Sequence, residues 1–348
     1  MPHLSETSSA GGSGGQPLSV PEGAPYHLVL AGQKRRIGRG ILAIVLLNAG
    51  LVGFGAAFAQ LGGQIDLLLG RDSVVTGGTE FTPVTMATTY GSTALLIPWS
   101  MLLQRWLYGV KGGSLHSVVG AFRPAVLGRA ILFLAPIWAI YMAVLAALEP
   151  SPAGSWAVAD LLFMFAVTIV IVPLQSAGEE YGYRGLIFRV AGSWGRGPRS
   201  ALTLGVVVSA VLFATIHLST DVWLNLQYLA VGVAFALITW RTGGIETAVV
   251  LHAANNVFGL LLALALHADL GASADRSSGV GSVVHLTPVV LLAVITAAVW
   301  YRTRRDGPAV TPMRASSQDA IPTAHTSDAG AHARFSAERG GAPGPRGR

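Results

Sequence analysis

Long runs of apolar residues constrain this chain of 348 residues more than any other feature. Eight stretches approach the length of about 20 apolar residues that a helix needs to cross the roughly 30 Å hydrocarbon core of a bilayer. They cover about residues 41–61, 84–103, 131–148, 158–195, 201–219, 222–240, 245–266 and 283–301. A membrane β-barrel would instead show segments of about ten residues with alternating hydrophobicity. The sequence therefore predicts an all-α polytopic membrane protein with about eight transmembrane helices.

The composition agrees with a chain that is embedded in a lipid bilayer. Hydrophobic residues make up 52% and charged residues 11%, which is too apolar for an ordinary soluble domain of this size. The absence of cysteine excludes disulfides, thiolate metal ligands and cysteine nucleophiles, so any catalysis would use oxygen or imidazole groups. The many Ala, Gly, Arg and Val residues are typical of a bacterial genome of high GC content.

Both ends of the chain differ from its apolar middle. Residues 1–33 are rich in Ser, Gly and Pro and lack the basic start and apolar core of a cleavable signal. Residues 306–348 are dominated by Ala, Gly, Pro, Ser and Arg and show no apolar periodicity. We expect two disordered cytoplasmic tails around a transmembrane domain at 34–305, whose first span acts as the insertion signal.

Basic residues gather in alternate loops, whereas the loops between them are mostly acidic. The basic loops carry Lys34, Arg35, Arg36, Arg39, Arg105, Lys111, Arg123, Arg196, Arg199, Arg241, Arg302, Arg304 and Arg305. The positive-inside rule therefore predicts that both termini are cytoplasmic. Topology and attraction to anionic lipid account for the net charge of +6, so we expect no nucleic-acid partner. The sequence does not indicate an oligomeric state.

Charged residues interrupt the long fourth stretch. Glu179 and Glu180 follow the apolar run LLFMFAVTIVIVPL, although an ionised residue near the bilayer centre costs on the order of 3 kcal/mol. Glu180 and Arg184 are four residues apart, so they share a helical face and can form an ion pair. Glu179 points about 100° away from that face. Pro173 and Gly178 are expected to kink the helix.

Two other spans carry polar residues at overlapping depth. At 1.5 Å per residue from the basic ends, His217 lies about 27 Å deep, His252 about 16 Å and Asn256 about 22 Å. Glu180 lies about 24 Å deep by the same measure. Three helices thus bring acids, imidazoles and an amide to similar depth, and we predict that these groups form one cluster.

The predicted cluster has the groups that peptide-bond hydrolysis requires. A carboxylate beside imidazoles can remove a proton from water and return it to a leaving amine, while an amide can donate to an oxyanion. We favour Glu179 as the base, because Arg184 would hold Glu180 in its charged, weakly basic form. Glu179, His217 and His252 also match the ligand set of a catalytic divalent metal such as zinc. Direct and metal-assisted activation of water both stay open.

Three short motifs on these spans resemble those of a known family. The stretches EEYGYR (Glu179–Arg184), FATIH (Phe213–His217) and HAANN (His252–Asn256) resemble, in order and spacing, the E-E-x-x-x-R, F-x-x-x-H and H-x-x-x-N motifs of the CPBP family. This family contains the type II CAAX prenyl endopeptidases and bacteriocin-processing or abortive-infection proteins. The resemblance covers about residues 130–266. Tyr183 stands where relatives often carry Phe.

The resemblance implies an eight-helix intramembrane endopeptidase that acts on a membrane-associated peptide or protein, CAAX-type processing being one form of this reaction. The roles that it implies are water activation for Glu179 and His217, stabilisation of the tetrahedral intermediate for His252 and Asn256, and support of the site for Glu180 and Arg184. Phe213 is expected to be a packing residue.

The same residues are also compatible with different roles. Glu180 and Arg184 can form a purely structural ion pair, and Asn255 and Asn256 can link helices by hydrogen bonds. The chain can also be a non-catalytic immunity or scaffold protein of the same fold. A proton- or ion-coupled transporter is a further alternative, because intramembrane Glu and His build proton relays. The sequence shows no inverted repeat or matched pair of broken helices, which disfavours the transporter.

Overall fold

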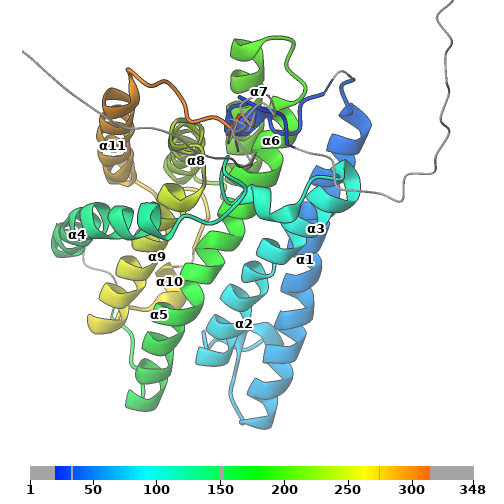
Figure 1. The fold of residues 1–348 in the computed structure, drawn as a ribbon. Coiled ribbons are helices and arrows are strands. Elements are labelled where there is room, and N and C mark those ends of the chain that lie inside the picture. Colours follow the sequence, from blue (N-terminus) through cyan, green and yellow to red (C-terminus); the bar gives the residue numbers. More distant parts are fainter. Residues whose placement is uncertain (1–19, 33, 149–152, 274, 314–348) are drawn as a thin grey trace, which may run out of the picture. The chain divides into compact units, whose positions relative to one another are not determined.

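The structure is a computed structural model that describes residues 20–32, 34–148, 153–273 and 275–313. Within these residues the chain is almost entirely helical and contains only isolated β-bridges (Figure 1). Seven helical segments are long and apolar enough to cross a membrane. They are Ile37–Leu68 (α1), Pro124–Leu148 (α4), Val158–Gly192 (α5 to α6), Pro198–Thr215 (α7), Val222–Thr242 (α8), Glu246–Ala265 (α9) and Val283–Thr303 (with α11, Thr287–Thr303). The prediction of an all-α membrane protein is confirmed.

The stretch predicted as the second span, residues 84–103, folds as two helices. α2 (Pro83–Ala94) and α3 (Leu96–Tyr108) meet at Leu95. Pro98 explains the break, because proline has no N–H to donate to the preceding turn and its ring crowds that turn. Neither helix alone has the length of about 20 residues that a crossing needs. The predicted number of eight spans is therefore not confirmed.

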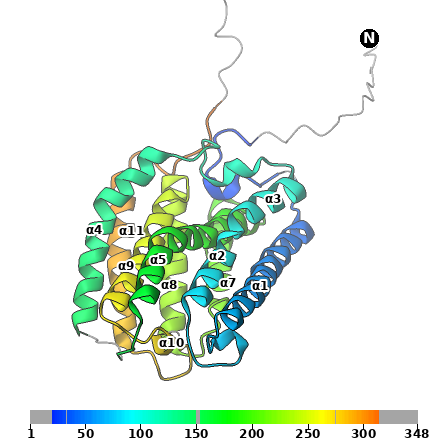
Figure 2. The ribbon, with the colours of Figure 1, turned by 90° about the horizontal axis from the view of Figure 1, so that it is seen from below.

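The helices that carry the candidate site residues pack against one another. α5 packs against α2 on one side and α9 on another, and α1 packs along α2 (Figure 1). α4 packs along α9 (Figure 2), while α8 packs against both α7 and α11. α5 and α9 are thus neighbours. α7 packs against the helical segments that directly follow α5.

The helix of the two glutamates widens directly after them. α5 (Val158–Glu180) continues into a π-helical segment (Tyr181–Ile187) and then into α6 (Phe188–Gly192). At the end of the π-helical segment the N–H of Phe188 donates to the carbonyl of Tyr183, five residues back. Single π-helical turns inside α-helices are frequent at functional sites. The wide turn moves the residues after the glutamates sideways relative to a regular helix.

Gly178 makes a close helix contact, and its part in the predicted kink stays a prediction. A Cβ atom at Gly178 would lie 2.2 Å from the carbonyl oxygen of Thr93 and 3.2 Å from the Cα of Ala94. The backbone of α5 therefore touches the end of α2 one residue before Glu179. Pro173 lies inside α5, and the helix continues on both sides of it.

The predicted tails are too long, because both flanks of the helical domain pack against it. Tyr26 is fully buried, and its hydroxyl donates to the carbonyl of Leu115 at 2.6 Å. The N–H of Thr311 donates to the carbonyl of Ala24, which joins the two flanks. Residues 20–32 and 306–313 are therefore ordered parts of the domain. The remaining parts of the predicted tails lie outside the described residues.

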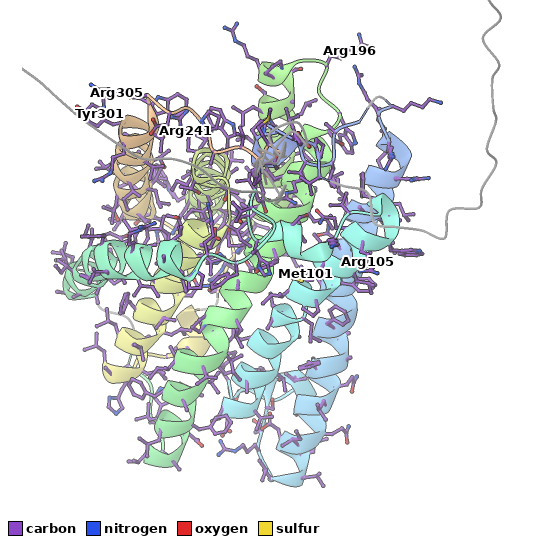
Figure 3. All side chains as sticks on the ribbon, viewed as in Figure 1. Met101, Arg105, Arg196, Arg241, Tyr301 and Arg305 are labelled. Carbon is purple, nitrogen blue, oxygen red and sulfur yellow. The ribbon has the colours of Figure 1, made fainter. Side chains whose placement is uncertain are left out.

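The pairing of the two flanks places them on the same side of the helices, as the predicted topology requires. Arg196, Arg241 and Arg305, which the charge pattern assigns to one membrane face, lie toward the same end in Figure 3, and Arg105 lies lower in that view. Which side faces the cytoplasm stays a prediction.

His27 makes the stability of the folded N-terminal flank dependent on pH. Burial lowers the pKa of His27 to about 4, and neither ring nitrogen has a hydrogen-bond partner among the described residues. The unfolded chain, with a pKa near 6.5, binds more protons between pH 6.5 and 4, so the free energy of unfolding falls as pH falls through that window. The loss should reach roughly 3 kcal/mol at pH 4.

We expect thermal unfolding in detergent at pH 7, 6 and 5 to show a smaller pH dependence for His27→Phe than for the wild type. Phenylalanine keeps the ring that stacks on Phe188 and removes the titrating group. Equal pH dependence of the two proteins would contradict this account.

Candidate active site

Glu180 lies at the centre of a buried ion-pair network. Nη1 of Arg184 lies 3.1 Å from Oε1 of Glu180, and both side chains are fully buried. The same oxygen accepts a hydrogen bond from Nδ1 of His252 at 2.8 Å. The guanidinium of Arg184 stacks on Phe213, with Cζ 3.8 Å from the ring centroid. The ion pair expected from the four-residue spacing is present, and it joins residues of α5, α7 and α9.

Glu179 is the more exposed of the two adjacent glutamates, although its side chain is also buried. Its Oε1 accepts a hydrogen bond from Nε2 of Gln175 at 2.5 Å, and its Oε2 has no hydrogen-bond partner among the described residues. Oε2 of Glu180 also has none, but Glu180 is 0% exposed whereas Glu179 is 8% exposed. Nε2 of His252 lies 3.7 Å from Oε2 of Glu179, which is beyond a direct hydrogen bond. One water molecule could contact both atoms.

His217 joins the cluster through an aromatic ring. Its Nδ1 donates to the carbonyl of Phe213 at 2.7 Å, which leaves Nε2 as an acceptor. The ring of Phe213 lies with its centroid 4.8 Å from His217 and 5.9 Å from His252, and Tyr228 stacks on His217 at 3.8 Å. Among the described residues, no ion pair within 4 Å links His217 to Glu179. Phe213 packs as expected, and it does so between the two imidazoles.

The side chains, as they lie, do not form the suggested metal site of Glu179, His217 and His252. In the part of the chain that the structure describes, no three His, Asp or Glu side chains come together in a way that could hold a metal ion. Nδ1 of each imidazole is already hydrogen-bonded, and the ring of Phe213 contacts both histidines. The metal ligand set therefore stays a prediction.

Asn256 connects α9 to α5. Its Nδ2 donates to Oε1 of Gln175 at 3.1 Å and to Oγ of Ser176 at 3.3 Å, while its Oδ1 accepts from Nδ2 of Asn255 at 3.1 Å. Both amide hydrogens are therefore directed at α5. Gln175 in turn donates to Glu179, so Asn256 helps to position the candidate base. Asn255 bonds within its own helix and does not show the interhelical contact considered for it.

Sequence reasoning missed three members of the cluster. Gln175 and Ser176 each lie four residues before one of the glutamates, so helical spacing would have pointed to them. Tyr228 carries no spacing signal, because it lies on a separate helix outside the three motifs. The hydroxyl of Tyr183, which stands where relatives often carry Phe, donates to Oδ1 of Asn48 at 2.9 Å.

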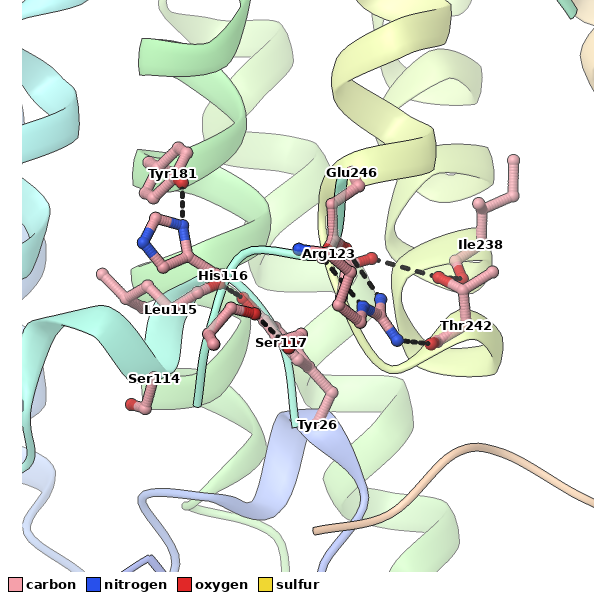
Figure 4. A network of polar contacts seen from close by, with 12 residues as sticks. Tyr26, Ser114, Leu115, His116, Ser117, Arg123, Tyr181, Ile238, Thr242 and Glu246 are labelled. Carbon is pink, nitrogen blue, oxygen red and sulfur yellow. Dashed lines mark hydrogen bonds and ion pairs between the residues drawn. The ribbon is translucent and has the colours of Figure 1, made fainter. Parts of the chain in front are cut away.

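A second polar network supports the cluster from the loop between α3 and α4 (Figure 4). Tyr181, directly after Glu180, shares a hydrogen bond with Nδ1 of His116. Arg123 donates to both carboxylate oxygens of Glu246, at 2.8 and 2.7 Å, and to the carbonyl of Thr242 at 3.0 Å. Glu246 begins α9, the helix of His252. The loop therefore holds the π-helical segment and α9 in fixed positions.

The fold and the cluster define a polytopic helical membrane protein with a buried site of two glutamates, an arginine and histidines. Residues 156–258, which include this cluster, match the family described as type II CAAX prenyl endopeptidase Rce1-like. The chain therefore contains an Rce1-like domain, and the resemblance carried by the three motifs is confirmed.

The uncharacterized protein YyaK of Bacillus subtilis (strain 168) is similar to the same part of the chain. It is 31% identical over 103 residues, which are 28% of this chain and 33% of that protein. The match thus spans about a third of the length of this relative. No solved structure matches the chain.

Proposed function

We propose that this protein is an intramembrane endopeptidase that hydrolyses a peptide bond of a membrane-associated peptide or protein. The observation that carries the proposal is the free Oε2 of Glu179, 3.7 Å from Nε2 of His252, in a buried cluster within an Rce1-like domain. The family description supports a protease, and CAAX-type processing is one reaction of this class. The bilayer around the apolar helices supports a substrate that is itself bound to the membrane.

Glu179 is the general base in this proposal. Its Oε2 takes a proton from a water molecule while the water oxygen bonds to the carbonyl carbon of the scissile peptide. The carbon–nitrogen bond then breaks as Glu179 returns the proton to the leaving nitrogen. General acid–base catalysis of this kind contributes typically about 10²- to 10⁴-fold to the rate.

His252 stabilises the charge that develops on the peptide oxygen. The hydrogen bond from Nδ1 to Glu180 fixes the ring, and the carboxylate balances the charge of an imidazolium whose Nε2–H donates to the oxyanion. Nε2 of His217 accepts the second hydrogen of the water. Asn256 has its amide hydrogens on α5, so we assign it the positioning of Gln175 and Glu179 and not the oxyanion contact.

Glu179→Gln is expected to abolish cleavage while the protein still folds. Glutamine keeps the size of the side chain but cannot take up the proton. Comparative proteomics of membrane fractions from cells that make the wild type or the variant should reveal a precursor that accumulates only with the variant. Tyr183→Phe is the matched control, because it removes only the hydroxyl that bonds to Asn48. It should process the precursor normally.

Different outcomes would assign a different function. If Glu179→Gln accumulates no precursor and keeps the cellular phenotype of the wild type, the protein acts as a scaffold. If the variant loses proton or ion flux in proteoliposomes and no cleavage is found, it is a transporter. Cleavage by the wild type that a chelator stops and zinc restores would support the metal ligand set.

A further inference from the structure

A second buried carboxylate lies at the other end of α1, outside the candidate active site. Asp66 is 0% exposed and belongs to the last turn of α1. Three buried hydroxyl residues surround it: Ser73 in the loop after α1, Thr82 at the N-cap of α2 and Thr85 in its first turn. The four side chains come from three segments of the chain that meet at the corner between α1 and α2.

The oxygens of these side chains are close together. Oδ2 of Asp66 accepts hydrogen bonds from Oγ1 of Thr82 at 2.7 Å and Oγ1 of Thr85 at 3.3 Å. Oγ1 of Thr85 also lies 3.0 Å from Oγ1 of Thr82 and 3.0 Å from Oγ of Ser73. The polar atoms of the cluster are thus all oxygens, and two of them belong to a carboxyl group.

Among the residues that the structure describes, Asp66 forms no ion pair within 4 Å, and the charge of Arg71 acts on it only at longer range. Oδ1 of Asp66 is buried without a hydrogen-bond partner. The nearby guanidinium of Arg71 binds both oxygens of Asp160, at 2.9 and 2.6 Å. A buried carboxylate without a counter-charge is costly.

We propose that the cluster of Asp66, Ser73, Thr82 and Thr85 binds a sodium ion. Oxygen ligands suit small hard cations, and one carboxylate balances one positive charge. The ion would contact the free Oδ1 and lie among the hydroxyls, so it would link the end of α1 to the start of α2. Because α2 packs on α5, the bound ion would stabilise the helix next to the one that carries Glu179, and it would take no part in the reaction of Glu179.

The position of the cluster allows access from water. Asp66 follows Arg39 by about 27 residues of continuous helix, or about 40 Å at 1.5 Å per residue. This exceeds the hydrocarbon thickness of roughly 30 Å, so the cluster lies near the membrane surface opposite the basic end of α1. The proposal is independent of the proposed protease activity.

The test is thermal unfolding of the full chain in detergent, in sodium chloride against choline chloride at equal ionic strength. We expect a higher midpoint in sodium chloride, by about 2 °C or more, with a saturable dependence on sodium. Asp66→Asn and Thr85→Val should remove this difference. Thr88→Val is the matched control, because the hydrogen bonds that its hydroxyl makes within the described residues go to carbonyls of its own helix, and it should keep the difference.

Three results would overturn the proposal. The first is equal unfolding of the wild type in sodium and choline chloride, and the second is a sodium effect that survives in both site variants. The third is stabilisation by calcium without stabilisation by sodium, which would assign a divalent ion. If Asp66→Asn does not fold, Thr85→Val decides alone, because it keeps the carboxylate and removes only one hydroxyl.

Discussion

Arg184→Met is expected to lower the free energy of unfolding by about 3–5 kcal/mol, because it leaves the carboxylate of Glu180 buried without its cation. Arg184 and Glu180 are both fully buried, and the guanidinium also packs on the rings of Phe213 and Phe235. Methionine fills much of the same volume, so the lower free energy of unfolding would reflect the unpaired carboxylate of Glu180 more than lost packing. Chemical unfolding in detergent micelles measures it.

The double variant Glu180→Gln with Arg184→Met is the control. Removing both charges should recover a large part of the lost stability, because no unpaired ion is then buried. Glutamine can still accept the hydrogen bond from His252. If Arg184→Met alone is as stable as the wild type, or if the double variant is less stable than both single variants, the description of this ion pair is wrong.

Gly178→Ala is expected to destabilise the protein by about 1–3 kcal/mol or more and to reduce any cleavage sharply. The new methyl group would meet the backbone carbonyl of Thr93 at 2.2 Å, and backbone atoms cannot move aside as a flexible side chain can. α5 would have to move away from the end of α2. Glu179 is the next residue, so the candidate base would move with it.

Gly259→Ala on α9 is the matched control for this substitution. Apart from its chain neighbours and the nearby backbone of its own helix, no atom of the described residues lies within 4 Å of the added Cβ. Alanine is also the better helix former, so stability should stay equal or rise. Thermal unfolding of both variants measures the contrast. Equal behaviour of the two alanine variants would show that α5 and α2 do not touch at Gly178.

Most of the helices could be predicted from the sequence, because a span needs a long apolar run and such runs are local. The exception is 84–103, where hydropathy gives one span and Pro98 divides it into two helices. The order of the helices in space, such as α5 between α2 and α9, depends on tertiary packing and has no local signal.

The candidate site was predictable where helical spacing applies. The pairing of Glu180 with Arg184 follows from a four-residue step, and overlapping depth on two spans predicted one cluster that contains both Glu180 and His252. The predicted cluster also implied a direct contact between His217 and Glu179, and the described residues show no ion pair between them within 4 Å. The depth of a residue along a helix does not determine the direction in which its ring points. Nothing in the local sequence indicated the π-helical segment after the glutamates.

Contacts between distant segments were also beyond local reasoning. Tyr26 lies in a stretch whose composition is typical of a tail, yet its hydroxyl bonds to Leu115 and its ring is buried. Thr311 behaves similarly at the other end of the chain. A single buried aromatic residue can order such a stretch. The overall composition of the stretch does not reveal the contribution of that one residue.

The most direct test of the account is cleavage by the purified protein in proteoliposomes that contain a library of membrane-inserted peptides, in water enriched in oxygen-18. The account predicts that the wild type cuts at least one peptide and places a single heavy oxygen in the new carboxyl group, and that Glu179→Gln is slower by about 10²-fold or more while Tyr183→Phe matches the wild type. Equal cleavage by the wild type and Glu179→Gln would contradict the assignment of Glu179 as the base.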